Sequence, residues 1–194
     1  MKKQGRLQDK IALITGASGG QGLVEAELFA AEGAVVILAD VSDKPGKALA
    51  RTIVKRGGRA AYINLDVTKT AHWTRAVKFA QREFGGIHVL VNNAGVVSRT
   101  PVADVTDREW ALVLAINLTG PMIGTRAVLP LMRDSGGGSI VNISSTVAQP
   151  RSVFRMCATC SLNSTTSEGA SSLLTRRPPG GIMVNFRSRH TNST

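Results

Sequence analysis

Cysteine is scarce in this sequence, with only Cys157 and Cys160 among 194 residues. Two cysteines cannot build a disulfide framework, and no further cysteine is available to complete a four-ligand zinc site. Their Cys-x-x-Cys spacing suggests a redox motif only weakly, because no preceding strand places it at the start of a helix. We therefore expect no metal and no thiol-based reaction.

Long apolar runs are also absent. The longest, such as residues 11–14 and 35–39, are far too short to cross a bilayer, and residues 1–10 hold no apolar region of the signal-peptide type. We expect a cytoplasmic protein with no membrane partner. The length and the 43% content of hydrophobic residues suit one globular domain with a substantial core.

Aromatic residues are few: one tyrosine, two tryptophans and five phenylalanines. The net charge of +11 raises the possibility of a nucleic-acid partner, so its distribution matters. Residues 151–194 contribute +5, from six arginines against Glu168, and residues 1–150 contribute the remaining +6. Because the excess is spread along the chain and no basic run is interleaved with aromatics, we expect no nucleic-acid partner.

The chain does contain an alternation of short β-rich apolar runs and longer stretches of helical periodicity. The runs predict strands at 11–15, 35–39, 60–64, 88–92 and 139–143, and the periodic stretches predict helices near 20–33, 45–57, 70–84 and 107–132. Such units fold by right-handed crossovers into an α/β, doubly wound, mostly parallel sheet of the Rossmann type. Ligands then bind outside the carboxyl ends of the strands.

The composition changes near Pro150. Residues 151–194 contain 14 serines or threonines, no tyrosine, lysine or aspartate, and little sustained periodicity. We divide the chain into a domain at 1–150 and an irregular C-terminal segment at 151–194, so that the fold is truncated or irregular at this end. The alternative is that this segment holds a loop and one ragged helix.

A glycine-rich string, Thr15 to Gly22, follows the first predicted strand and opens the first predicted helix. Its glycines let the backbone approach a pyrophosphate closely, and the free N–H groups at the helix start attract negative charge. The second strand ends at Asp40, eighteen residues after Gly22, where a carboxylate can accept hydrogen bonds from both adenosine ribose hydroxyls. This pairing predicts a dinucleotide-binding domain.

Asp40 also favours NAD over NADP. Its charge repels a 2′-phosphate, and Val41 follows it instead of an arginine that could neutralise one. The alternative is that Asp40 only caps a turn before Lys44.

Further motifs follow in order after the glycine string, which has the spacing Thr-Gly-x-x-x-Gly-x-Gly. Asp66 and Val67 follow the third strand, residues 92–95 are Asn-Asn-Ala-Gly, Asn117 lies in a helical stretch, and Ser144 and Ser145 follow the fifth strand. Together they resemble the classical short-chain dehydrogenase/reductase family over about 135 residues. Taken singly, each has a structural alternative: Asn117 could bridge segments, the serines could cap a turn, and Asp66 could close a loop.

The resemblance implies a role for each motif. Asp66 would contact adenine, Asn117 would hold a proton-relay water, and Ser145 would polarise the substrate oxygen. The implied NAD-binding residues are Gly16, Ser18, Gly20, Gln21, Gly22, Asp40, Asp66, Val67, Asn93, Ala94 and Gly95. The implied activity is an NAD-dependent interconversion of a secondary alcohol and a ketone, with a small molecule as the partner. The family usually forms homo-oligomers, and loss of the helix that follows the family's catalytic tyrosine would weaken that interface here.

One part of the family pattern is missing. The family passes a proton through a Tyr-x-x-x-Lys pair, whose tyrosine would fall near Ala158 and whose lysine near Leu162. Tyr62 is the only tyrosine of the chain and Lys78 is its last lysine. We therefore expect impaired catalysis, with a non-catalytic dinucleotide-binding protein or a defective product as alternatives.

A possible remnant of the family's sixth strand lies at residues 181–185. Our hypothesis is that residues 150–180 arise from an altered reading frame. Translation of the coding DNA in its other two frames tests this hypothesis, and absence of Tyr-x-x-x-Lys from both would remove it.

Overall fold

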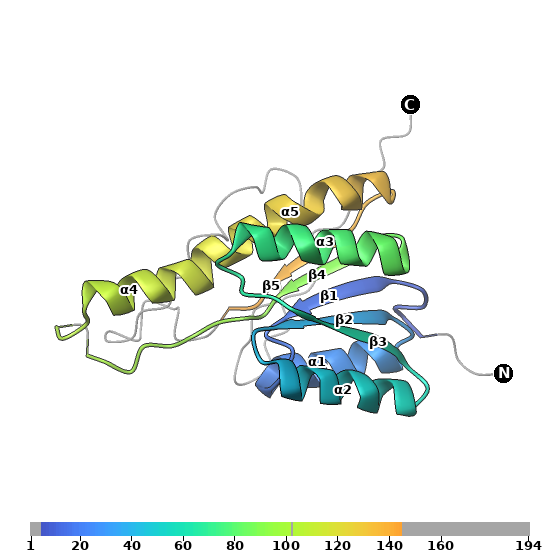
Figure 1. Ribbon diagram of the computed structural model, residues 1–194, viewed down its shortest axis with the longest axis horizontal. Helices are drawn as coiled ribbons and strands as arrows, with labels where there is room; N and C mark the ends of the chain where they lie inside the picture. The colour runs from blue at the N-terminus through green and yellow to red at the C-terminus, as the bar shows by residue number, and fades with distance from the viewer. Residues whose placement is uncertain (1–4, 102, 145–194) are drawn as a thin grey trace, which may run out of the picture.

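The structure is a computed structural model that describes residues 5–101 and 103–144. A twisted sheet of five parallel strands forms its centre (Figure 1). The order across the sheet is β3-β2-β1-β4-β5, so the chain builds outward from β1 in one direction and then in the other. The strands are β1 (Ile11–Thr15), β2 (Val35–Asp40), β3 (Arg59–Asn64), β4 (Val89–Asn92) and β5 (Ser139–Asn142).

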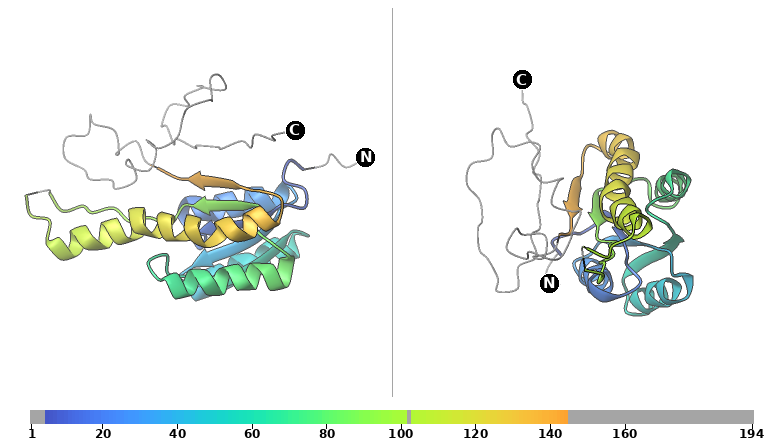
Figure 2. Two further views of the ribbon diagram at one scale, coloured as in Figure 1. Left: turned by 90° about the horizontal axis from the view of Figure 1, so that it is seen from above. Right: turned by 90° about the vertical axis from the view of Figure 1, so that its left-hand side faces the viewer.

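Helices cover both faces of this sheet. The helices are α1 (Gly20–Ala31), α2 (Asp43–Lys55), α3 (Thr70–Phe84), α4 (Asp107–Leu114) and α5 (Gly120–Asp134). Helices α1 and α2 pack on one face, while α3 and the α4–α5 stretch pack on the other (Figures 1 and 2). The predicted doubly wound α/β fold is therefore confirmed.

The strands form because their apolar runs can be buried from both sides. Every residue of β1 is buried, and alternate side chains enter two separate core layers. Leu13 packs in the layer under α3 and α5, together with the fully buried Trp73. Its neighbour Ile14 packs in the layer under α1 and α2. Burial on both faces explains why these strands show continuous apolar runs instead of alternation.

The stretch that we expected as one helix at 107–132 contains an irregularity. A wide π-helical turn, η1 (Ala115–Thr119), lies between α4 and α5, and the N–H of Gly120 donates to the carbonyl of Ala115 five residues earlier. Pro121 explains part of this geometry, because it has no N–H to donate to the carbonyl of Asn117 as an α-helix requires. π-Helical turns of this kind are frequent at functional sites.

Among the described helices, the stretch Asp107–Asp134 is long and apolar enough to cross a membrane by length and composition alone. Apolar runs did not reveal it, because Arg126 and other polar residues interrupt the stretch. It lies against the sheet and α3, with Val113, Ile123 and Val128 buried. A core helix of a doubly wound sheet has this same composition, so the stretch is weak support for a membrane partner.

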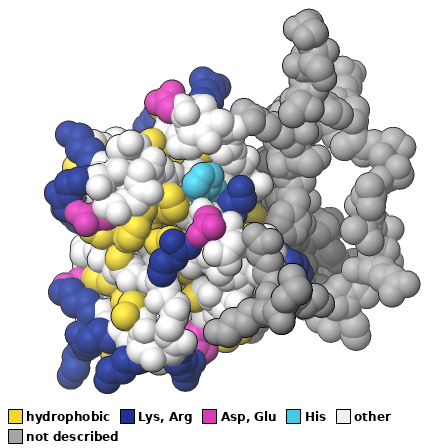
Figure 3. Space-filling model, turned by 90° about the vertical axis from the view of Figure 1, so that its right-hand side faces the viewer, with side chains coloured by type: hydrophobic (Ala, Val, Ile, Leu, Met, Phe, Trp, Pro, Cys, Tyr) yellow, Lys and Arg dark blue, Asp and Glu magenta, His cyan; other side chains and the backbone are white. Residues whose placement is uncertain are grey.

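Positive charge is distributed around the molecule. Figure 3 views the edge where the strands begin, and Lys and Arg side chains lie both along the rim and in the middle of this face, with apolar side chains between them. Exposed ion pairs compensate part of this charge, among them Arg6 with Glu32 at 3.0 Å and Arg59 with Asp9 at 2.7 Å. The spread seen in the sequence is thus also a spread in space.

Candidate functional site

The candidate site lies at the carboxyl ends of the strands, where the direction of sheet growth reverses between β1 and β4. The segments that follow β1, β2, β3 and β4 all meet at this edge, on the left in Figure 1. Reversal points of this kind open a crevice that binds ligands in doubly wound sheets.

Thr15, the last residue of β1, organises the centre of the crevice. Its hydroxyl donates to the carbonyl of Val91 at 3.2 Å and accepts from the N–H groups of Asn93 and Ala94, each at 3.0 Å. The side chain is 1% exposed. Thr15 therefore ties the glycine-rich turn to the segment after β4, a role that the sequence analysis did not assign.

Asn93 completes this connection from the other side. Its side-chain amide donates to the carbonyls of Thr15 and Gly16, at 2.9 and 3.2 Å. Gly16 has φ +64°, and a Cβ there would stand 2.8 Å from the Cα of Ala94. A Cβ at Gly22 would stand 2.5 Å from the amide nitrogen of Asn93. The spacing of the motif therefore serves close approach between two backbone segments.

The other side of the glycine turn is open. Beyond the adjoining backbone, no atom of the described residues lies within 4 Å of the positions that a Cβ would take at Gly19 and Gly20. Gly19 precedes helix α1 and gives it no side-chain cap, so N–H groups at the helix start remain available to an anion. Gln21 turns away along the helix, where its amide donates to Glu25 at 2.9 Å; burial raises the pKa of Glu25 above its usual value.

Asp40, at the end of β2, faces the glycine turn. One carboxylate oxygen accepts the N–H of Ser18 at 3.0 Å, and the other accepts the N–H of Ser42 at 2.9 Å. The turn-capping alternative is therefore realised in the structure. Because each carboxylate oxygen offers two lone pairs, capping leaves capacity for ribose hydroxyls.

A polar network that the sequence analysis missed supports Asp40. The Tyr62 hydroxyl lies 2.7 Å from the carbonyl of Asp40 and 3.0 Å from the carboxylate of Asp43. Hydrogen bonds from Lys47, Asn64 and Tyr62 lower the pKa of Asp43 to about 2. Burial, with the bond to Asp43, raises the pKa of Tyr62 to about 12. The register of β2 and β3, which sets Asn64 beside Asp40 at the strand ends, is the feature that could have located this network.

Asp66 and Val67 follow β3 and form the next part of the edge. One oxygen of Asp66 accepts both the N–H and the hydroxyl of Thr68, at 2.9 and 2.7 Å, as the loop-closing alternative expects. Burial acts to raise the pKa of Asp66, but the bonds from Thr68 and the charge of Lys69 bring it below its usual value. Asp66 is therefore a charged acceptor at neutral pH.

Asn117 lies in the wide turn η1 and is 5% exposed. Its side chain makes two hydrogen bonds to the backbone of Val96, which follows the Asn-Asn-Ala-Gly motif. The bridging alternative is thus seen, and the side chain is occupied by protein. Gly95 lies beside it, since a Cβ there would stand 3.5 Å from the Asn117 oxygen.

Several predicted positions lie outside the described residues: Ser145, Cys157, Cys160, the domain boundary at 150 and the possible strand at 181–185. Within the described part of the chain, no cluster of three or more His, Cys, Asp or Glu side chains could hold a metal ion.

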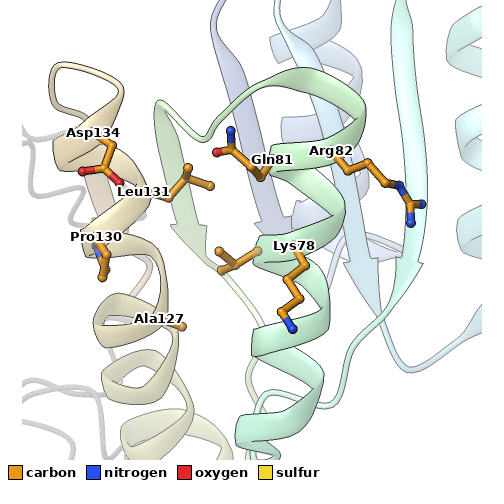
Figure 4. A pocket seen from close by; sticks show the side chains of 8 residues that line it. Lys78, Gln81, Arg82, Ala127, Pro130, Leu131 and Asp134 are labelled. Atoms are coloured by element: carbon orange, nitrogen blue, oxygen red, sulfur yellow. The ribbon is translucent and has the colours of Figure 1, made fainter.

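A groove of roughly 360 Å³ lies elsewhere, between the C-terminal halves of α3 and α5 (Figure 4). Val77 and Lys78 line it from α3, and Ala127, Pro130 and Leu131 line it from α5. Because α3 and α5 end where the strands begin, this groove is at the opposite end of the sheet from the candidate site. It contributes no residue to the crevice.

The chain belongs to the short-chain dehydrogenase family, whose model matches residues 10–161. It is 45% identical over 141 residues to the 3-alpha-(or 20-beta)-hydroxysteroid dehydrogenase of Mycobacterium tuberculosis, covering 73% of this chain and 53% of that protein. It is 42% identical over 141 residues to the cyclopentanol dehydrogenase of Comamonas testosteroni, covering 73% of this chain and 56% of that protein.

A solved structure from Burkholderia xenovorans, assigned to the short-chain dehydrogenases/reductases, has a TM-score of 0.71 and 38% sequence identity. The match covers 74% of this chain and 59% of that one. The chain therefore spans about half the length of the curated relatives that it matches. The family consists of oxidoreductases that use a nicotinamide dinucleotide, which makes the crevice the candidate cofactor site.

Proposed function

We propose that the crevice binds NAD(H). The observation that carries this proposal is the glycine turn, whose backbone is open at Gly19 and Gly20 while Asp40 is bonded to the N–H of Ser18 at 3.0 Å. An anion can approach the open backbone, and a diol can reach the adjacent carboxylate. The residues present therefore fit the adenosine and pyrophosphate parts of the cofactor.

Each part of the site has its own role in this proposal. The turn from Gly16 to Gly22, with Ser18, Gly20 and Gln21, would hold the pyrophosphate at the start of α1. Asp40 would bind the ribose and disfavour a 2′-phosphate, because Val41 offers no positive charge. Asp66 and Val67 would bind adenine, while Asn93, Ala94 and Gly95 would line the way to the nicotinamide.

We further propose that the complete catalytic apparatus interconverts a secondary alcohol and a ketone, with a small-molecule substrate and a cytoplasmic location. A bound nicotinamide would accept or supply the hydride. Ser145 would polarise the substrate oxygen. The Asn117 side chain is bonded to Val96, so the relay water would be held by the backbone carbonyl of Asn117 instead. Pro121, four residues later, has no N–H to donate to this carbonyl.

Proton transfer is the step that this chain lacks. Tyr62, its only tyrosine, is bonded to Asp40 and Asp43 behind the adenosine end, where its pKa is raised to about 12. Lys78, its last lysine, lines the groove at the opposite end of the sheet. Neither group can act at the nicotinamide end, so we expect binding without measurable turnover.

Calorimetric titration of the full chain with NADH and NADPH tests the binding proposal. We expect measurable binding of NADH and weaker binding of NADPH. Equal affinity for both would contradict the assignment of Asp40, and absence of binding would remove the proposal and favour a defective product.

An absorbance assay at the nicotinamide band tests the catalytic part, with cyclopentanol and a hydroxysteroid as substrates. We expect no turnover above a blank without protein. Binding without turnover supports the second candidate function, a non-catalytic dinucleotide-binding protein. This function is favoured by the fit of the residues to the adenosine half of the cofactor and by the position of Tyr62 behind that half. Turnover by purified chain would overturn our account of proton transfer.

A further inference from the structure

The ring of His72 makes a hydrogen bond that the roles above leave unexplained. His72 lies in the first turn of α3, and its Nδ1 accepts the backbone N–H of Asp66 at 3.1 Å. A neutral imidazole whose Nδ1 accepts a hydrogen bond carries its proton on Nε2.

This bond does not serve helix α3 itself. A helix cap accepts from the N–H groups of the first helical turn, because these have no partner within the helix. His72 accepts instead from the N–H of Asp66, which lies four residues before the helix begins at Thr70. The ring therefore holds the loop between β3 and α3.

The next residue, Trp73, holds the same loop one residue further along the chain. The indole N–H of Trp73 donates to the carbonyl of Val67 at 2.9 Å, and the Trp73 side chain is fully buried. His72 and Trp73 thus fix the backbone on both sides of the Asp66–Val67 peptide from one rigid helix turn.

Two polar groups remain after these bonds are counted. The second carboxylate oxygen of Asp66 and the N–H of Val67 have no hydrogen-bond partner among the described residues. They are an acceptor and a donor on adjacent residues. The Watson–Crick edge of adenine offers the complement, an amino donor beside a ring-nitrogen acceptor.

We propose that His72 is a positioning residue for adenine: it holds the N–H of Asp66 so that the Asp66 carboxylate and the Val67 N–H face the base together. This inference rests on the proposed binding of NAD(H) and adds to it the residue that sets the geometry of base recognition. It predicts that removal of the Nδ1 acceptor weakens selection of the base specifically.

The test compares two ligands in three proteins. NADH carries adenine, while its deamino analogue carries hypoxanthine, which has a carbonyl in place of the amino group. We expect the wild-type chain to prefer NADH by about tenfold, the order of a bidentate contact to a base edge. In His72→Leu, which keeps bulk but has no acceptor, this ratio should fall several-fold; in His72→Asn, whose Oδ1 can replace Nδ1, it should be largely retained.

The ratio separates positioning from a general structural role, because a loss of fold weakens both ligands alike. An unchanged ratio in His72→Leu, or an equal loss in His72→Asn, overturns the role of His72 alone. Failure of the wild-type chain to bind either dinucleotide overturns the proposed function and the inference with it.

A measurement on the wild-type chain covers the case in which His72→Leu does not fold. Nitrogen NMR shifts of the His72 ring distinguish the two neutral tautomers. A protonated Nε2 and a bare Nδ1 support the proposal, and the opposite tautomer overturns it.

Discussion

Asn117 holds the backbone of Val96 by two hydrogen bonds, accepting its N–H at 2.8 Å and donating to its carbonyl at 2.7 Å. The pair joins the wide turn η1 to the segment after β4, 21 residues earlier in the chain. A side-chain amide can pair with both groups of one residue because it carries a donor and an acceptor side by side.

Asn117→Leu is therefore expected to loosen this segment. The substitution removes both partners of Val96, and we expect it to lower the free energy of unfolding by about 1 to 2 kcal/mol. Urea denaturation followed by tryptophan fluorescence measures the change. Thr119→Ala, at an exposed position of the same turn, is the control and should change little. If the two variants are equally stable, the pair contributes nothing to the fold.

Thr15 offers a sharper comparison, because serine keeps its hydroxyl. Thr15→Val leaves the N–H groups of Asn93 and Ala94 without their acceptor, and we expect a loss of about 2 kcal/mol in the free energy of unfolding. Thr15→Ser should lose much less. Denaturant unfolding of both variants decides the matter, and a Thr15→Val protein as stable as the Thr15→Ser protein would show that the hydroxyl has no such role.

The sequence was sufficient for the fold because burial on both faces leaves a direct trace in composition. Strand β1 is five buried residues in a row, and its predicted bounds are those of the structure. The prediction of a single helix at 107–132 missed the wide turn η1. Such a turn depends on how Asn117 and Pro121 fit their neighbours, and it has no periodic signature in the sequence.

The site was predictable only where a motif names the residue. The glycine string and Asp40 stand at the expected edge of the sheet, but the network of Tyr62 and Asp43 arises from strand register and could not be seen as a local pattern. The bonds from His72 and Thr15 are likewise tertiary. The roles of the cofactor-binding residues and of Ser145 remain predictions.

Cofactor selection provides a prediction at Asp40. Asp40→Ala removes the carboxylate that repels a 2′-phosphate, so NADH should bind about tenfold more weakly and the preference over NADPH should shrink. Asp134→Asn removes one negative charge at an exposed position at the opposite end of the sheet and is the matched control. Calorimetric titration of the three proteins gives the ratios. A ratio that shifts equally in both variants would reflect net charge alone.

His88 provides a prediction on pH. Its Nδ1 accepts the N–H of Ile11 at 3.0 Å, next to the first residue pairs of β1 and β4. Burial, together with the charge of Lys10, lowers the pKa of His88 below its ordinary value of 6.5. The folded chain therefore favours the neutral ring, and the unfolded chain binds a proton more readily.

It follows that the stabilisation from neutral His88 is fully present above pH 6.5 and is lost as the pH falls from there through the lower pKa of the folded chain. Thermal unfolding between pH 8 and pH 5 measures this, and His88→Asn, which keeps an acceptor without a titrating ring, is the comparison. The melting temperature of the wild-type chain should fall more steeply below pH 6.5 than that of His88→Asn. Parallel profiles would mean that other groups carry the pH dependence, because the difference between the two proteins isolates this one ring.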